Sequence, residues 1–179
     1  MPKYVAFLRA INVGGHIVKM GHLRQLFEAL GFSNVETFIA SGNVVFDSPS
    51  KNTKTLERKI EGLLGETFGY RVDTFVRSTS ELANIAQYKP FDDSELETDG
   101  NVLYVTFTSV EPTAEFKRKL LTFITEVDDF QVYGREVYCL SRKKLGESKF
   151  TGAQLEQILG MPATVRNANT VKRLAAKYC

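Results

Sequence analysis

The sequence is poor in the residues that build disulfide frameworks, metal centres and membrane spans. Its 179 residues include 2 cysteines, 2 histidines, 5 prolines and no tryptophan. The cysteines, Cys139 and Cys179, match neither a disulfide framework nor a metal-ligand spacing. No apolar run approaches the roughly 20 residues of a membrane span, and the start at Met1 lacks a signal-peptide core. We therefore expect a soluble cytoplasmic protein with no cofactor, no metal site and no membrane partner.

Signatures of known enzyme classes are also scarce. Neither His16 nor His22 heads a carboxylate or cysteine cluster at metal-ligand spacing. The chain has no nucleophile elbow, no P-loop and no dinucleotide-binding glycine fingerprint. Cys139 alternates with apolar neighbours and is expected in the core. The sequence leaves enzymatic activity and oligomeric state open.

What the sequence does contain is one pattern of elements written twice. Strand-like runs and amphipathic helical segments follow the order β-α-β-β-α-β, first over 3–11, 20–30, 35–39, 44–47, 56–68 and 71–77. The same order recurs over 101–109, 112–124, 130–133, 136–140, 151–160 and 163–166. A final helix is expected over 170–178, with Asn169 as its N-cap.

This repeat predicts an α+β fold made of two ferredoxin-like βαββαβ units with an extra C-terminal helix. Residues 1–79 are expected to form the first subdomain. Residues 80–100 are expected to form a helical and acidic linker, and 101–179 the second subdomain with the terminal helix.

Charge is almost balanced overall but not along the chain. The net charge is +2, yet residues 80–129 carry 4 basic and 11 acidic groups, whereas 142–179 carry 8 basic and 2 acidic groups. A basic end can bind a polyanion, or it can pair with the acidic middle of the same chain. Both readings follow from the sequence.

The predicted topology brings polar side chains of the first half to one edge of the sheet. In a split βαβ unit the first two strands run parallel, so the loop after the first strand and the turn after the second share an edge. Glycine leaves backbone amides accessible there, and amides at a helix start favour anions. The candidate ligand-binding residues at this edge are Arg9, Asn12, Gly14, Gly15, Ser41 and Asn43.

In the second half, the same geometry predicts that the third and fourth strands end together at the opposite edge of the sheet. The basic and amide side chains there suit the oxygens of phosphate groups. The candidate ligand-binding residues are Lys144, Ser148, Arg166, Asn167 and Asn169, and the basic residues Arg142, Lys143, Lys149 and Lys172 are expected beside them. RNA recognition modules share the βαββαβ order, but the corresponding strands here, such as 136–139, lack their Lys/Arg-Gly-aromatic run.

Three separated segments in order, 4–15, 41–46 and 163–171, are similar to the motifs of an uncharacterised bacterial family known as domain of unknown function 1697. The resemblance implies two intertwined ferredoxin-like α+β subdomains and supplies no accepted activity. The chain departs from the family pattern at Ala10, where Gly is usual, and at Ala168, where Trp is typical.

The sequence supports three functional hypotheses. The first is binding of a phosphate-bearing ligand, either a nucleotide or nucleic acid, at the two polar edges. The second is an enzyme acting on a small anionic substrate that Arg9 and Asn12 orient. The third is an interaction module without a ligand, whose acidic and basic segments act as matching surfaces.

Overall fold

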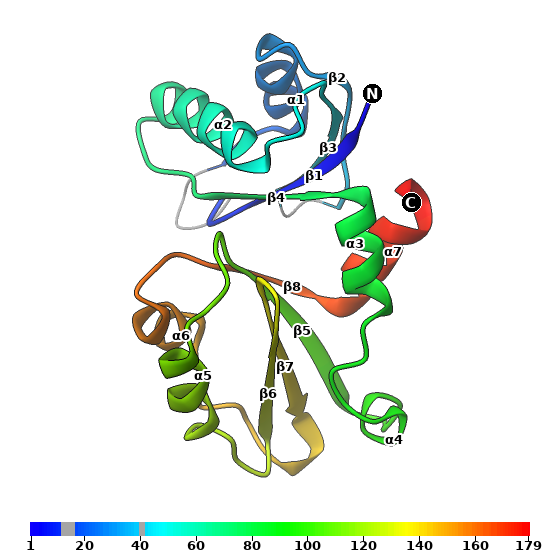
Figure 1. Cartoon of the computed structure of the whole chain (residues 1–179), viewed down its shortest axis with the longest axis vertical. Coiled ribbons are helices and arrows are strands. Elements are labelled where there is room, and N and C mark those ends of the chain that lie inside the picture. The colour runs from blue at the N-terminus through cyan, green and yellow to red at the C-terminus, as the bar shows by residue number, and fades with distance from the viewer. Residues whose placement is uncertain (12–16, 40–41) are drawn as a thin grey trace. The chain divides into compact units, whose positions relative to one another are not determined.

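The fold was analysed in a computed structural model that describes residues 1–11, 17–39 and 42–179. The strands and helices of the two predicted repeats follow one another in the order expected from the sequence, and two short helices over 93–96 and 143–145 are additional (Figure 1). Their bounds are β1 (Lys3–Leu8), α1 (Met20–Ala29), β2 (Ser33–Thr37), β3 (Asn43–Asp47), α2 (Thr53–Phe68), β4 (Thr74–Ser78), α3 (Thr79–Gln87), α4 (Asp93–Leu96), β5 (Asn101–Phe107), α5 (Ala114–Leu121), β6 (Asp128–Tyr133), β7 (Glu136–Arg142), η1 (Lys143–Leu145), α6 (Gly152–Leu159), β8 (Thr164–Asn167) and α7 (Ala168–Tyr178).

The first four strands form an antiparallel sheet in the order β2-β3-β1-β4. Both helices of this unit, α1 and α2, lie on one face of the sheet (Figure 1). Every second strand residue points toward them, which fills the core between sheet and helices with side chains such as Leu8, Phe46 and Ile60. Phe7 pairs with Asn43, so the end of β1 lies beside the start of β3 as the predicted topology requires.

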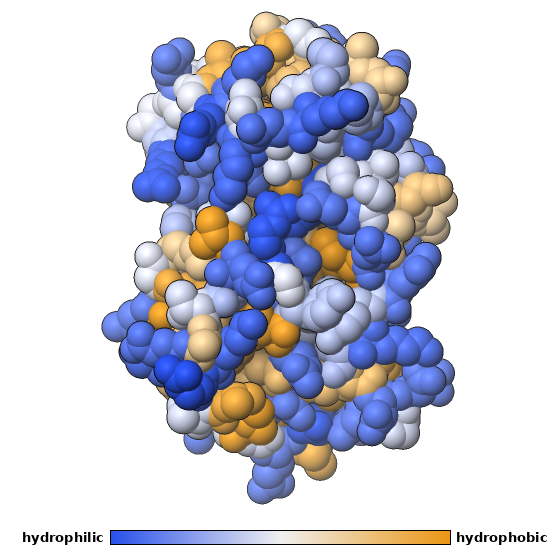
Figure 2. Space-filling view, in the orientation of Figure 1, coloured by the Kyte–Doolittle hydropathy of each residue, from blue (hydrophilic) through white to orange (hydrophobic). Residues whose placement is uncertain are grey.

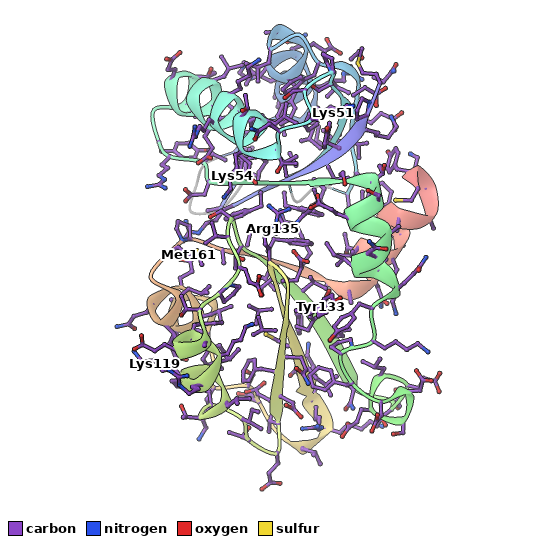
Figure 3. The ribbon with its side chains drawn as sticks, viewed as in Figure 1. Lys51, Lys54, Lys119, Tyr133, Arg135 and Met161 are labelled. Carbon is purple, nitrogen blue, oxygen red and sulfur yellow. The ribbon has the colours of Figure 1, made fainter. Side chains whose placement is uncertain are left out.

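The second four strands repeat this arrangement in the order β6-β7-β5-β8. The helices α5 and α6 lie together on one face of this sheet (Figure 1). The opposite face carries aromatic residues, among them Tyr133, whose ring stacks on Tyr88 with 4.4 Å between centroids (Figure 3). The α+β class and the double βαββαβ order are thus those predicted from the sequence.

Local capping residues set several helix ends. Thr151 and Gln154 form the predicted capping box at the start of α6, and Gly160 ends that helix in the left-handed conformation. The prediction for α7 was wrong in detail, because this helix begins at Ala168 directly after β8. The side chain of Asn167, two residues before the expected N-cap, accepts the N–H of Asn169 at 2.9 Å.

The chain divides into two compact units, Met1–Asn84 with Leu174–Cys179, and Ile85–Arg173. The last residues of α7 belong to the first unit, where the Tyr178 hydroxyl donates to Glu36 at 2.6 Å. Lys177 pairs with the same carboxylate at 3.5 Å. The sequence predicts these residues as part of the second subdomain, 101–179, whereas in the structure they cluster with the first unit.

Within the described residues, no helix is both long enough and apolar enough to cross a membrane.

Candidate functional site

The second unit contains a cavity of about 540 Å³ between its sheet and the α6 side of the helical layer. Four strands, α6 and the loop after β7 contribute to its wall. The lining residues are Tyr104, Thr106, Asp128, Phe130, Cys139, Ser141, Lys143, Gly146, Glu147, Ser148, Phe150, Thr151, Gly152, Leu155, Glu156, Ala163 and Val165.

The cavity follows from a mismatch in length between the helices and the strands of this unit. Both α5 and α6 have 8 residues, or about 12 Å of helix. The strands β5 and β7 have 7 residues each, or about 23 Å. The helices therefore cover part of the sheet, and residues 143–151 close over the rest. In the first unit α2 has 16 residues, or about 24 Å, and is longer than β1, which has 6 residues, or about 20 Å.

Strand alternation decides which side chains face the cavity. Tyr104 pairs with Cys139 across β5 and β7, and Cys139 pairs with Phe130 across β7 and β6. Directly paired residues of an antiparallel sheet point to the same face. Asp128 and Ser141 form the next such pair along β6 and β7, so carboxylate and hydroxyl groups lie beside aromatic rings on one floor.

Asp128 is the principal charged group inside the cavity. It is 8% exposed, and its Oδ2 accepts a hydrogen bond from Ser148 Oγ at 2.8 Å. Ser148 is held in turn by the N–H of Phe150, which donates to its oxygen at 3.3 Å. Burial raises the pKa of the nearby Cys139 thiol to about 12, the Asp128 charge adds to the rise, and a hydrogen bond from Thr106 opposes it. The cavity floor thus holds a carboxylate and a neutral thiol.

Aromatic rings and one lysine form the more open part of the wall. The ammonium of Lys143, an exposed residue, lies 5.7 Å from the centroid of the Tyr104 ring. Phe150 contacts Phe130 edge-on, with 4.9 Å between ring centroids, and Phe123 lies 5.1 Å from Phe150 on the other side. Planar apolar groups of a ligand would find matching surfaces here.

The remaining carboxylates of the wall have local roles. Glu156 accepts the N–H of Ala163 through Oε1 at 3.1 Å, which ties α6 to the start of β8. Glu147 is exposed on the loop after β7. On the outer side of the helical layer, Lys119 of α5 pairs with Glu115 at 3.6 Å (Figure 3). Of these groups, Glu156 links two elements of the cavity wall.

The predicted polar edge of the first unit is described only in part. Asn12, Gly14, Gly15 and Ser41 lie outside the described residues. Asn43 is buried, and its amide donates to the carbonyl of Phe38 at 3.1 Å, which closes the turn between β2 and β3. Arg9 is half-buried, and its backbone N–H donates to Asp73 at 2.9 Å.

The acidic stretch before β5 pairs with the basic residues predicted at the edge of the second unit. Arg142 donates to both oxygens of Glu95 at 3.1 and 3.0 Å and to Asp129 at 3.3 Å. These hydrogen bonds hold the pKa of Glu95 below its usual value. Lys144 donates to Asp99 at 2.7 Å. Pairing within the chain therefore neutralises much of this basic cluster.

The other predicted residues of that edge point in different directions. Ser148 lines the cavity. Arg166 pairs with Val105 on the opposite face, where it is buried and donates to Thr164 Oγ1 and to the Val165 carbonyl, both at 2.8 Å. Burial lowers its pKa to about 10. The exposed Asn167 caps α7 by accepting the N–H of Asn169, so these two residues are structural partners of each other.

Sequence reasoning missed Tyr104 and Asp128 as site residues, whereas Lys143, which lines the cavity, belongs to the basic group expected at the strand ends. Strand alternation over 101–107 and 136–142 predicts which residues next to them share one face of the sheet, so the sequence contains part of the signal for this site. The sequence contains no signal for the depth of the cavity, because that depth depends on how the loop over 143–151 packs. Across the described ranges, no group of three or more His, Cys, Asp and Glu side chains could hold a metal ion.

The surface of the protein is mixed in character. On the face shown in Figure 2, hydrophobic residues reach the surface as separate patches between hydrophilic ones. Because the hydrophobic residues on this face are scattered, we take the cavity in the second unit as the candidate site.

Comparison with known proteins gives a family and a fold. No functionally curated protein shows significant similarity to this chain. The structure is similar to that of the conserved bacterial protein SP0830 from Streptococcus pneumoniae, with a TM-score of 0.76 and 20% sequence identity over 98% of this chain and 97% of the other. The model of a family described as protein of unknown function (DUF1697) matches residues 1–138, which include Tyr104 and Asp128. The chain therefore belongs to the DUF1697 family of proteins of unknown function.

Proposed function

We propose that this protein binds a small phosphate-bearing molecule of nucleotide size in the cavity of the second unit. The planar body of the ligand packs against the aromatic wall, and its anionic group pairs with Lys143. The observation that carries the proposal is the cavity itself. Its volume of about 540 Å³ is in the range of small-molecule sites, and it combines an apolar wall with a few polar groups.

Lys143 is the cation best placed to receive the phosphate. It lines the cavity and is exposed, so an anionic group can reach it without losing all of its water. Within residues 1–11, 17–39 and 42–179 no carboxylate pairs with its ammonium. The neighbouring Arg142 and Lys144, in contrast, are paired with acidic residues. The charge of Lys143 is therefore available to a ligand.

A single nucleotide fits this site better than a nucleic acid strand. A strand needs several unpaired cations along a groove, because each contacts one phosphate. The pairing of Arg142 and Lys144 removes cations from the edge where a strand would run. The cavity, moreover, is lined in part by the loop after β7, and its volume of about 540 Å³ suits one small molecule rather than a series of stacked bases.

Calorimetric titration of the purified protein with adenosine and guanosine 5′-monophosphates, the matching nucleosides, inorganic phosphate and a 20-nucleotide single strand tests the proposal. We expect a monophosphate to bind more tightly than its nucleoside, and Lys143→Ala to weaken it by about tenfold, the usual effect of losing a charged hydrogen bond. Lys149→Ala, which removes an exposed lysine that does not line the cavity, should leave binding unchanged. Failure of all mononucleotides to bind would refute the proposal. Tight, strongly salt-dependent binding of the single strand alone would favour nucleic acid instead.

A further inference from the structure

We propose that the ligand of this cavity presents two adjacent N–H donors to the carboxylate of Asp128, as the Watson–Crick edge of a guanine base does. This inference rests on the proposed function and adds the class of base to it.

The first step is that Asp128 has capacity for more hydrogen bonds than the protein supplies. A carboxylate accepts about four hydrogen bonds through its two oxygens. Within the described residues, Asp128 receives one side-chain donor, Ser148 Oγ, at Oδ2. No lysine or arginine in that part of the chain forms an ion pair with it. Because the residue is 8% exposed, bulk water compensates little of the cost of burying its charge.

The second step is that the unfilled side of this carboxylate opens into the cavity. Asp128 and Ser148 both line it, and the hydrogen bond from the Phe150 N–H fixes the position of the Ser148 hydroxyl. Across the strand pair, Ser141 also lines the cavity, and no partner for its hydroxyl is found in the described ranges. A ligand inside the cavity therefore meets one acceptor with spare capacity and one adaptable hydroxyl.

The third step concerns which planar group matches a carboxylate. Guanine carries a ring N–H beside an exocyclic amino group, so both donate to the two oxygens of one carboxylate. Adenine and cytosine offer an amino group beside a ring nitrogen lone pair, which a carboxylate oxygen repels. Uracil offers one N–H between two carbonyl oxygens, which also repel a carboxylate. Asp128 thus selects guanine, while Lys143 at the exposed part of the wall receives the phosphate.

Native protein titrated with guanosine, inosine and adenosine 5′-monophosphates gives the first measurement. Inosine lacks the exocyclic amino group and keeps the ring N–H. We expect guanosine monophosphate to bind at least tenfold more tightly than inosine monophosphate, because inosine lacks one of the two donors to a charged acceptor. Adenosine monophosphate should bind most weakly, because the ring nitrogen lone pair beside its amino group repels the carboxylate.

The second measurement uses Asp128→Asn, which keeps the shape of the side chain and removes its charge. The variant should lose the preference for guanine by at least tenfold. Asp129→Asn is the matched control, because it makes the same change at the adjacent residue, whose carboxylate pairs with Arg142 instead. That control should keep the preference.

The outcomes separate the two proposals. Equal affinity for the three nucleotides in the native protein, with binding that still depends on Lys143, overturns the role of Asp128 and leaves the proposed function standing. Absence of all nucleotide binding overturns both. A guanine preference that Asp128→Asn retains also overturns the inference, provided that the variant unfolds at the temperature of the native protein.

Discussion

The thiol of Cys139 offers a direct chemical test of the cavity floor. Cys139 and Cys179 are the two cysteines of the chain, so a Cys179→Ser variant leaves Cys139 as the single reactive thiol. We expect this thiol to react slowly with a dithiodipyridine reagent in the native protein. The reference is the same variant unfolded in denaturant, where the thiol has its ordinary pKa.

The magnitude follows from the position of the thiol. Burial and the charge of Asp128 raise its pKa from 9.0 to about 12. At pH 8 the thiolate fraction then falls from about one in ten to about one in ten thousand, a loss of roughly 1,000-fold. A more basic thiolate is a better nucleophile, and a Brønsted coefficient of about 0.45 returns roughly 20-fold of that loss. The native thiol should therefore react about 50-fold more slowly than the unfolded one.

The assay is the absorbance of released pyridinethione over time, at pH values from 8 to 11. We expect the native rate to keep rising about tenfold for each pH unit through this range, because the pKa of the thiol, about 12, lies above it. The unfolded control should level off near pH 9. A native rate equal to the unfolded one, or a plateau near pH 9, would contradict the described environment of Cys139. Saturation with a cavity ligand should slow the native reaction further.

Three further predictions concern stability. Burial, with the charges of Asp73 and Glu57, raises the pKa of Glu61 to about 7. The contribution of this group to folding stability is therefore complete below pH 4.5 and is lost as the pH rises through 7. In urea unfolding, Glu61→Gln should stabilise the protein by about 1 kcal/mol at pH 8, a value limited by solvent screening of this half-buried group, and should have no effect at pH 4.5. Ala10 has a φ of 56°, a left-handed conformation that strains a residue with a side chain; Ala10→Gly should raise stability by about 0.5 kcal/mol once the added freedom of the unfolded chain is subtracted, and a loss of stability in urea would contradict this account. Arg142→Gln breaks the paired hydrogen bonds to Glu95 and should lower Tm by about 2–4 °C in calorimetry at low salt, and an undiminished effect in 1 M salt would count against the ion pair as its cause.

The fold could be predicted because its signals are local and repeated. Alternation of apolar residues over 101–107 marks β5, and the capping residues Thr151 and Gly160 bound α6. These patterns need no information about distant parts of the chain. The position of Ala10 was also visible, since the family usually has glycine there and the observed φ favours glycine.

The candidate site could not be predicted in the same way, because it depends on contacts between distant residues. Lys144 and Arg142 add to a basic segment in the sequence, yet Asp99 and Glu95, more than 40 positions away, neutralise them in the fold. Arg166 belongs to the same strand as Val165, but alternation directs it to the other face of the sheet. The total charge of a segment indicates neither which charged side chains form ion pairs nor which face of the sheet each side chain points to.

The division of the chain between its two units has a consequence for how the protein is made. The first unit consists of Met1–Asn84 together with Leu174–Cys179. A ribosome that adds about 5–20 residues per second completes Met1–Asn84 several seconds before it synthesises Leu174–Cys179. During that interval the surface around Glu36 and Phe38 lacks Tyr178, whose ring later lies 6.1 Å from that of Phe38. The amino-terminal half is therefore incomplete on the ribosome, and its final stability is reached only after translation has passed through the whole second unit.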